Sequence, residues 1–252
     1  MGGVSFKMNR RDDEEFFCNS LDRWRFRFLL ALCRKIYSNN NVFKGKTILN
    51  VGVGTGRESY LFLRQSPRFY FALDKSPSHL KEAVSILQPF KQVRFLFGDA
   101  HYLPFRSQSV DIVVLSEVLH HVRFPDRCID EAMRVAREMV IVDDAHKSKV
   151  RDLISYVLIK FKLKYEVERE ENRRLTFRLE DSFLSRKAKE NGFKFYTFPF
   201  YIHSFDEWFS KTRHYFFRNL YYLIVVFINK IRFLQRWGNR VVVLFIRSKL
   251  QH

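Results

Sequence analysis

Short apolar runs alternate with amphipathic stretches through the middle of the chain. The apolar runs are rich in β-branched and aromatic residues, as in buried strands, and they occupy residues 46–51, 69–74, 93–97, 110–115 and 138–143. The intervening stretches have helical periodicity, as in 76–87, which begins with Ser-Pro, and 125–136. Further strands are predicted at 193–200 and 240–247. The pattern predicts an α/β fold with a Rossmann-like seven-stranded sheet, mostly parallel with an antiparallel last strand, and helices on both faces.

Three segments lie outside this alternation. Residues 1–45 form an N-terminal extension with a helix predicted from Leu21 to Tyr37, in which Trp24, Phe28, Ala31 and Ile36 are expected to face inward. Helical insertions are predicted at about 147–175 and at 201–237. Because 252 residues suit one large α/β domain, we expect a single domain over 46–252 that carries both insertions.

Charge is concentrated in these additional segments. The chain has a net charge of +18, yet residues 46–144 contribute only +1, against +4 from 1–45, +5 from 145–192 and +8 from 193–252. A basic surface around a nearly neutral core favours a polyanionic partner, either nucleic acid or an anionic membrane. The three cysteines are scattered without a CxxC pair, which predicts no disulfide framework and no metal site, and favours a reducing, cytoplasmic location.

The most specific motif is a glycine-rich turn after the first predicted strand. Residues 48–59 read ILNVGVGTGRES, with Gly52, Gly54 and Gly56 ahead of a predicted helix. Glycines allow a ligand to approach the backbone beside the positive end of a helix. Asp74 ends the second strand, where a carboxylate can bind ribose hydroxyls. Asp99 and Ala100 follow the third strand in FGDAHYLPF.

Together with DIVVLSEVLHHV at 111–122, these strings resemble the class I S-adenosylmethionine-dependent methyltransferases over residues 46–144. The resemblance implies S-adenosylmethionine as the cofactor. It places the three glycines at the methionine end, Asp74 at the ribose, Asp99 and Ala100 at the adenine, and Glu117 beside the reacting centre. Lys75, next to Asp74, is a further cofactor-binding candidate. Asn50 stands where the family usually has an acidic residue that contacts the methionine ammonium group. The alternative is a dinucleotide-binding or inert domain of the same fold.

Candidate catalytic residues follow the fourth and fifth strands, because ligands bind at the carboxyl ends of such strands. They are Glu117, His120, Asp144 and His146, with His121 and Asp143 as neighbours. A carboxylate beside a histidine can accept a proton from an acceptor. The alternatives are that the histidine pair serves helix packing and that residues 143–146 form a helix cap.

The basic segments favour RNA as the methyl acceptor. Arg23, Arg27 and Arg34 recur at helical spacing, and 201–237 interleaves twelve aromatic residues with six basic ones, among them Lys211, Arg213 and Arg218. Such residues bind phosphates and stack on bases, although the aromatic residues could equally form core. The first hypothesis is therefore a methyltransferase of structured RNA, preferably ribosomal, with a cytosine amine as one specific acceptor. The alternatives are a small-molecule, quinone or lipid methyltransferase on an anionic membrane, and an inactive binding module.

Overall fold

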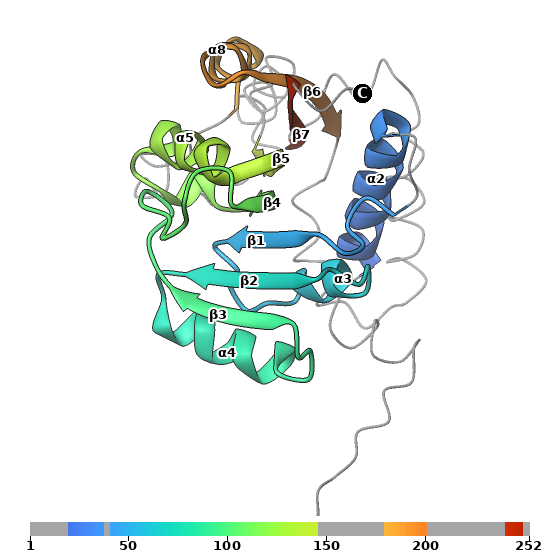
Figure 1. Ribbon diagram of the computed structural model, residues 1–252, viewed down its shortest axis with the longest axis vertical. Helices are drawn as coiled ribbons and strands as arrows, with labels where there is room; N and C mark the ends of the chain where they lie inside the picture. The colour runs from blue at the N-terminus through green and yellow to red at the C-terminus, as the bar shows by residue number, and fades with distance from the viewer. Residues whose placement is uncertain (1–19, 38–40, 146–178, 201–239, 249–252) are drawn as a thin grey trace, which may run out of the picture.

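The computed structural model describes residues 20–37, 41–145, 179–200 and 240–248 of the chain (Figure 1). Its centre is one seven-stranded sheet in the order β3-β2-β1-β4-β5-β7-β6. The strands are β1 (Thr47–Val51), β2 (Phe69–Asp74), β3 (Val93–Phe97), β4 (Val110–Ser116), β5 (Ala136–Ala145), β6 (Phe193–Phe200) and β7 (Arg240–Arg247). Strands β1 to β5 pair in parallel, while β7 runs antiparallel to both β5 and β6. The predicted fold class is confirmed, including the antiparallel last strand.

Helices cover both faces of the sheet (Figure 1). They are α2 (Ser20–Tyr37), α3 (Ser59–Leu63), α4 (Pro77–Leu87), the 3-10 turn η1 (Leu119–His121), α5 (Pro125–Val135) and α8 (Asp181–Asn191). Successive strand residues point to opposite faces. Thus Ile112 joins the core under α2, α3 and α4, whereas its neighbour Val113 joins the core under α5 and α8.

The register of α2 differs from the prediction. Its buried side chains are Phe26, Leu29, Leu32 and Cys33, whereas Ala31 is exposed and Phe28 and Ile36 are only half-buried. The buried positions pack against Val42 and Phe43 and against α3. Aromatic packing therefore fixes the rotation of the helix, and this rotation turns Arg25 toward the sheet.

Two of the three cysteines lie in the core of the protein. Cys33 and Cys128 are free and buried, and burial raises the pKa of each to about 12. Cys18 and both predicted insertions lie outside the described residues. No helix within the described ranges is long and apolar enough to cross a membrane.

Candidate active site

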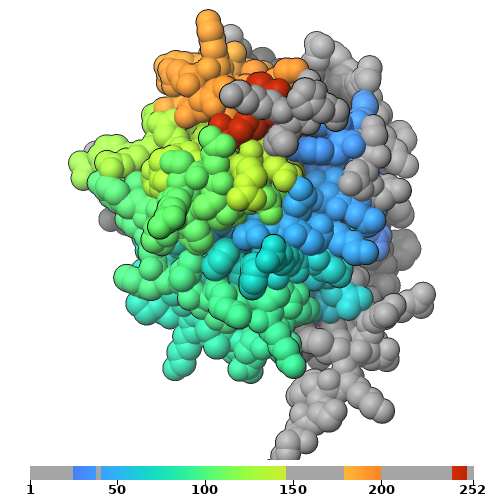
Figure 2. All heavy atoms as spheres, in the orientation of Figure 1, coloured from blue at the N-terminus to red at the C-terminus, as the bar shows by residue number. Residues whose placement is uncertain are grey.

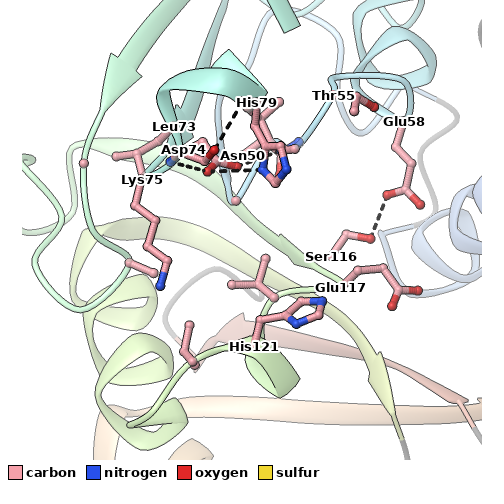
Figure 3. A pocket seen from close by; sticks show the side chains of 18 of the residues that line it. Asn50, Thr55, Glu58, Leu73, Asp74, Lys75, His79, Ser116, Glu117 and His121 are labelled. Carbon is pink, nitrogen blue, oxygen red and sulfur yellow. Dashed lines mark hydrogen bonds and ion pairs between the residues drawn. The ribbon is translucent and has the colours of Figure 1, made fainter. Parts of the chain in front are cut away.

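A cavity of about 460 Å³ lies at the carboxyl ends of β1, β2 and β4 (Figure 3). Parallel sheets bind ligands at this edge, where the strand order reverses between β1 and β4. The cavity wall contains most of the predicted cofactor residues: Asn50, Gly52, Gly54, Asp74, Lys75, Asp99, Ala100 and Glu117. Sequence positions that are up to 67 residues apart are therefore brought to one cavity.

The glycines after β1 serve three different purposes. A Cβ atom on Gly52 would lie 2.5 Å from Cγ2 of Val118, so this position admits no side chain. Gly54 lines the cavity at φ +54°, and a Cβ atom there would meet nothing within 4 Å, so it would project into open space. Gly56 does not line the cavity and instead packs against Ala83 and Leu87 of α4. The expectation that all three glycines face the ligand is therefore wrong for Gly56.

Asn50 presents a buried acceptor without a partner. Its Nδ2 donates to Ser59 Oγ at 3.1 Å, while its Oδ1 is buried and accepts no hydrogen bond from the described residues. Leaving a buried polar atom unpaired is costly. A ligand that donates a hydrogen bond to Oδ1 would remove that cost.

Asp74 is buried and shapes the turn as well as the cavity wall. Its Oδ2 accepts the Gly54 N–H at 2.8 Å, and its Oδ1 accepts the Ser76 N–H at 2.8 Å. Each carboxylate oxygen can accept a second hydrogen bond. Asp74 can therefore bind a ligand hydroxyl while it holds the glycine turn in place.

Asp99 also lines the cavity, and its side chain is half exposed. Its Oδ1 accepts the His101 N–H at 2.9 Å and contacts His101 Nδ1 at 2.5 Å. Burial opposes ionisation, but these contacts with His101 outweigh it and lower the pKa of Asp99. The side chain is thus a stable anion at the cavity wall.

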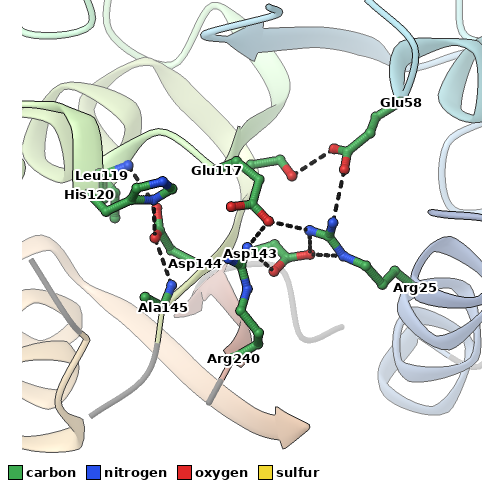
Figure 4. A network of polar contacts seen from close by, with 10 residues as sticks. Arg25, Glu58, Glu117, Leu119, His120, Asp143, Asp144, Ala145 and Arg240 are labelled. Carbon is green, nitrogen blue, oxygen red and sulfur yellow. Dashed lines mark hydrogen bonds and ion pairs between the residues drawn. The ribbon is translucent and has the colours of Figure 1, made fainter. Parts of the chain in front are cut away.

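A network of charged side chains includes Glu58 and Glu117 of the cavity wall and extends behind that wall (Figure 4). Arg25 of α2 forms ion pairs with Glu58 at 3.2 Å, with Glu117 at 3.1 Å and with Asp143 at 2.5 Å. Arg240, the first residue of β7, pairs with Glu117 and lies 3.5 Å from Asp143. Three carboxylates therefore share two guanidinium groups, which leaves a formal charge of −1 when all five are ionised.

Burial makes this charge arrangement responsive to pH. It raises the pKa of Asp143 to about 6, although the Arg25 guanidinium acts in the opposite direction. It also lowers the pKa of Arg240 to about 9, an effect to which the positive charge of Arg25 adds. The network therefore contains a carboxyl group that takes up a proton close to neutral pH.

Glu117 faces the cavity from a backbone conformation that is rare for its residue type. Its φ is +56°, a left-handed conformation that is strained for residues other than glycine. Both guanidinium groups contact its Oε1, and its Oε2 has no hydrogen-bond partner among the described residues. The side chain can therefore offer one oxygen to a ligand (Figures 3 and 4).

Asp144 and His120 lie behind the cavity wall. Asp144 is fully buried, and its carboxylate accepts the N–H groups of Leu119 at 2.7 Å and Ala145 at 2.6 Å. It also contacts Nδ1 of His120 at 2.7 Å, which raises the pKa of that histidine. The neighbouring His121 lines the cavity, and burial lowers its pKa. Asp144 is thus placed to position the η1 turn rather than to touch a ligand.

The remaining predicted residues lie on surfaces or outside the described residues. Arg27 and Arg34 are exposed on α2, and the side chain of Arg23 on the same helix is not among those described. His146, Lys211, Arg213 and Arg218 fall in the undescribed ranges. Arg25, Glu58 and Arg240 were not predicted from the sequence. The one signal was the carboxylate of Asp143 at the end of the apolar run MVIV, because a buried charge needs a partner.

Comparison with known proteins agrees with this geometry. The family described as "Methyltransferase domain" matches residues 49–141, the stretch that supplies the glycine turn, Asp74, Asp99 and Glu117. Residues 49–141 are therefore similar to a methyltransferase domain. The match agrees with the predicted enzyme class, an S-adenosylmethionine-dependent methyltransferase, and with S-adenosylmethionine as its cofactor.

Relatives with different substrates share this domain. The demethylmenaquinone methyltransferase of Thermobifida fusca is 30% identical over 114 residues, which cover 42% of this chain and 47% of that protein. The tRNA U34 carboxymethyltransferase of Hahella chejuensis is 29% identical over 138 residues, which cover 52% of this chain and 42% of that protein. The chain thus spans less than half the length of these relatives.

The fold has counterparts among solved structures. The magnesium protoporphyrin IX methyltransferase ChlM of Synechocystis PCC 6803, solved with bound SAH, superposes with a TM-score of 0.59 at 16% identity. The superposition covers 98% of this chain and 90% of that one. At this identity the likeness establishes the fold of the chain and not its substrate.

Proposed function

We propose that the methyltransferase transfers the methyl group of S-adenosylmethionine to a lipophilic small molecule of the quinone or lipid type, at a hydroxyl or amine group. The reacting end of the cavity is the part of its wall at Glu117, where the methyl group would be transferred. The charge of the network formed there by Glu58, Glu117, Asp143, Arg25 and Arg240 carries this proposal. Among the described residues of the network, Glu58, Glu117 and Asp143 outnumber Arg25 and Arg240, so the network disfavours a phosphate beside it and favours a hydrogen-bond donor.

The cavity suits the cofactor along its length. The unpaired Oδ1 of Asn50 would accept a hydrogen bond from the methionine ammonium group, and the free lone pairs of Asp74 would accept the ribose hydroxyls. Asp99, Ala100 and Lys75 would border the adenine. When bound, the cofactor supplies an electrophilic methyl group on a sulfonium ion.

The protein then acts mainly by positioning, because methyl transfer is an in-line displacement. The acceptor oxygen or nitrogen forms a bond to the methyl carbon while the carbon–sulfur bond breaks. The electron pair of the broken carbon–sulfur bond stays on sulfur. Oε2 of Glu117 would hold the acceptor's O–H or N–H, and the network provides Asp143 as a final site for the released proton. Arg25 and Arg240 fix Glu117 in its strained conformation.

The position of α2 also supports a small acceptor. Arg25 reaches Glu117 and Asp143 from this helix with a side chain that is only 10% exposed, so α2 packs behind the cavity wall at Glu117 (Figure 4). A nucleotide within folded RNA would have to leave its base stack and enter the cavity beside α2. The demethylmenaquinone relative agrees with a quinone-like acceptor.

RNA remains the second candidate function, with two observations in its favour. One is the net charge of +18, and the other is the tRNA-modifying relative. A cytosine amine of ribosomal RNA stays a prediction within that hypothesis, and so does a cytoplasmic location.

The experiment is methyl transfer from labelled S-adenosylmethionine to two acceptor pools, a total lipid extract and total RNA. We expect label in the organic-soluble fraction, unaffected by ribonuclease and lost in Asp74→Ala, whose cofactor site is damaged. Label that enters RNA and disappears with ribonuclease would replace the proposal with the RNA hypothesis. Cofactor binding is measured on the same samples, so that an inactive preparation is recognised.

A further inference from the structure

Exposed aromatic side chains gather beside the mouth of the cavity. Tyr102 is 62% exposed and Phe124 is 55% exposed. Tyr102 follows Ala100 of the cavity wall by two residues, and Phe124 follows Val122 of the same wall by two residues. Exposed apolar groups of this size are typical of binding surfaces when they occur together.

Direct contacts join the two aromatic residues into one patch. The ring of His101 packs edge-on against the ring of Phe124, with 6.0 Å between centroids, and the Phe124 N–H donates to His101 Nε2 at 3.4 Å. Arg127 donates from Nε to the carbonyl of His101 at 3.2 Å and lies over the ring of Tyr102 at 3.8 Å. Arg123 lies over the ring of Phe124 at 5.2 Å. We call these five residues the rim patch.

The rim patch carries two arginines that form no ion pair within the described residues. Arg123 and Arg127 are both exposed, and neither forms an ion pair with any residue in the described parts of the chain. The nearby carboxylate of Asp126 is directed elsewhere, to Arg186 and Lys187 of α8 at 3.8 and 3.5 Å. Aromatic rings beside unpaired arginines match the chemistry of an anionic lipid surface.

We propose that the rim patch docks on an anionic lipid bilayer and so presents the mouth of the cavity to acceptors dissolved in that bilayer. The inference rests on the proposed function and deepens it, because a lipophilic acceptor partitions into the membrane rather than into water. Tyr102 and Phe124 enter the interfacial region, while Arg123 and Arg127 contact lipid phosphates.

The ring contacts favour a membrane over single-stranded nucleic acid. A base binds an aromatic residue through the face of the ring. One face of Tyr102 and one face of Phe124 already lie under guanidinium groups. Insertion into a lipid interface needs only exposed apolar surface, which both rings retain.

Co-sedimentation of the full chain with phosphatidylglycerol and phosphatidylcholine vesicles tests this surface. Wild type should bind the anionic vesicles, and Arg123→Gln with Arg127→Gln should weaken binding about 30-fold, from about fivefold per arginine near a charged surface. Tyr102→Ser with Phe124→Ser should weaken it by about tenfold through lost apolar burial. Arg123→Lys with Arg127→Lys should restore the affinity, because it restores the charge.

The matched control lies at the opposite edge of the sheet. Arg68 covers the ring of exposed Phe69 at the start of β2, a pair of the same type far from the cavity mouth. Arg68→Gln with Phe69→Ser should leave vesicle binding unchanged.

Three results would overturn the proposal. The first is that wild type does not bind anionic vesicles, and the second is that the rim variants bind them as tightly as wild type. The third is that the control variant loses as much vesicle affinity as the rim variants. Retention on structured RNA, lost in the rim variants, with no vesicle binding would assign the patch to nucleic acid instead. Vesicle binding needs no catalysis, so its outcome is independent of the acceptor assay. S-adenosylhomocysteine binding by every variant shows that the cavity is intact.

Discussion

Replacing Arg25 with methionine removes the cation that three carboxylates share. The Arg25 side chain is only 10% exposed, and its partners Glu58, Glu117 and Asp143 are drawn from the turn before α3, the end of β4 and strand β5. Methionine keeps much of the side-chain length without the charge. Arg240 would then face all the negative charge alone, and it makes no ion pair with Glu58 among those that the structure describes.

The expected loss of folding free energy is about 3–5 kcal/mol at pH 8, the range for breaking a buried ion pair by removing one partner. For a chain of this size, that corresponds to a fall in Tm of about 6–20 °C. The loss should shrink as the pH falls. Burial already raises the pKa of Asp143 from 3.8 to about 6, and Arg25 opposes that rise. Without Arg25 the folded-state pKa rises further, so protonation of the carboxyl group below pH 6 stabilises the folded variant.

Urea unfolding at pH 8 and at pH 5.5 measures both effects, with Arg27→Met as the control. Arg27 lies two residues away on the same helix but is exposed, so its substitution should change stability by less than about 0.5 kcal/mol. Equal losses for Arg25→Met and Arg27→Met, or a loss for Arg25→Met that does not depend on pH, would refute the assignment of Arg25 to a buried network.

Three further outcomes follow from the site. Gly54→Ala and Gly192→Ala both place a Cβ atom in open space at positive φ, so each variant should lose about 1–2 kcal/mol of folding free energy. Calorimetry should show weaker S-adenosylhomocysteine binding only for Gly54→Ala. In wild type the raised pKa of Asp143 predicts that its contribution to folding becomes less unfavourable between pH 7 and pH 5, visible as proton uptake by the folded state. Asp144→Asn should lower the pKa of His120 in NMR titration, because the carboxylate contact that raises that pKa is lost; an unchanged pKa would contradict the contact.

The strands of the sheet were predictable because each is defined by local composition. Residues 69–74, 93–97, 193–200 and 240–247 were predicted with the bounds that the structure shows for β2, β3, β6 and β7. Helix α8 was missed because only Leu184, Lys187 and Ala188 are buried in it, a stripe too narrow to stand out in a charged segment. The rotation of α2 was also missed, since it depends on contacts of Phe26 with Phe43 and Phe62 that periodicity cannot show.

The cofactor side of the cavity was largely predictable and the acceptor side was not. Asp74 ends β2, and Gly54 and Asp99 come within three residues of the ends of β1 and β3, so parallel pairing must bring them to one edge of the sheet. Arg25 and Arg240 come from elements outside residues 49–141, and their approach to Asp143 depends on how those elements pack. No local sequence pattern encodes how closely these two guanidinium groups approach Asp143.

The two ends of the cavity differ in charge, and this difference restricts the acceptor. Among the described residues of the network, Glu58, Glu117 and Asp143 outnumber Arg25 and Arg240 by one, whereas Arg123 and Arg127 add positive charge beside the cavity mouth. A polyanion drawn to the mouth would be repelled as its reactive group moved inward, because Coulomb interactions strengthen in a buried site. A neutral acceptor held at an anionic surface meets no such conflict. The surface would bind the mouth, and the acceptor would enter alone toward Glu117. Under the two proposals, the charge pattern would separate the partner that the protein docks on from the molecule that it methylates.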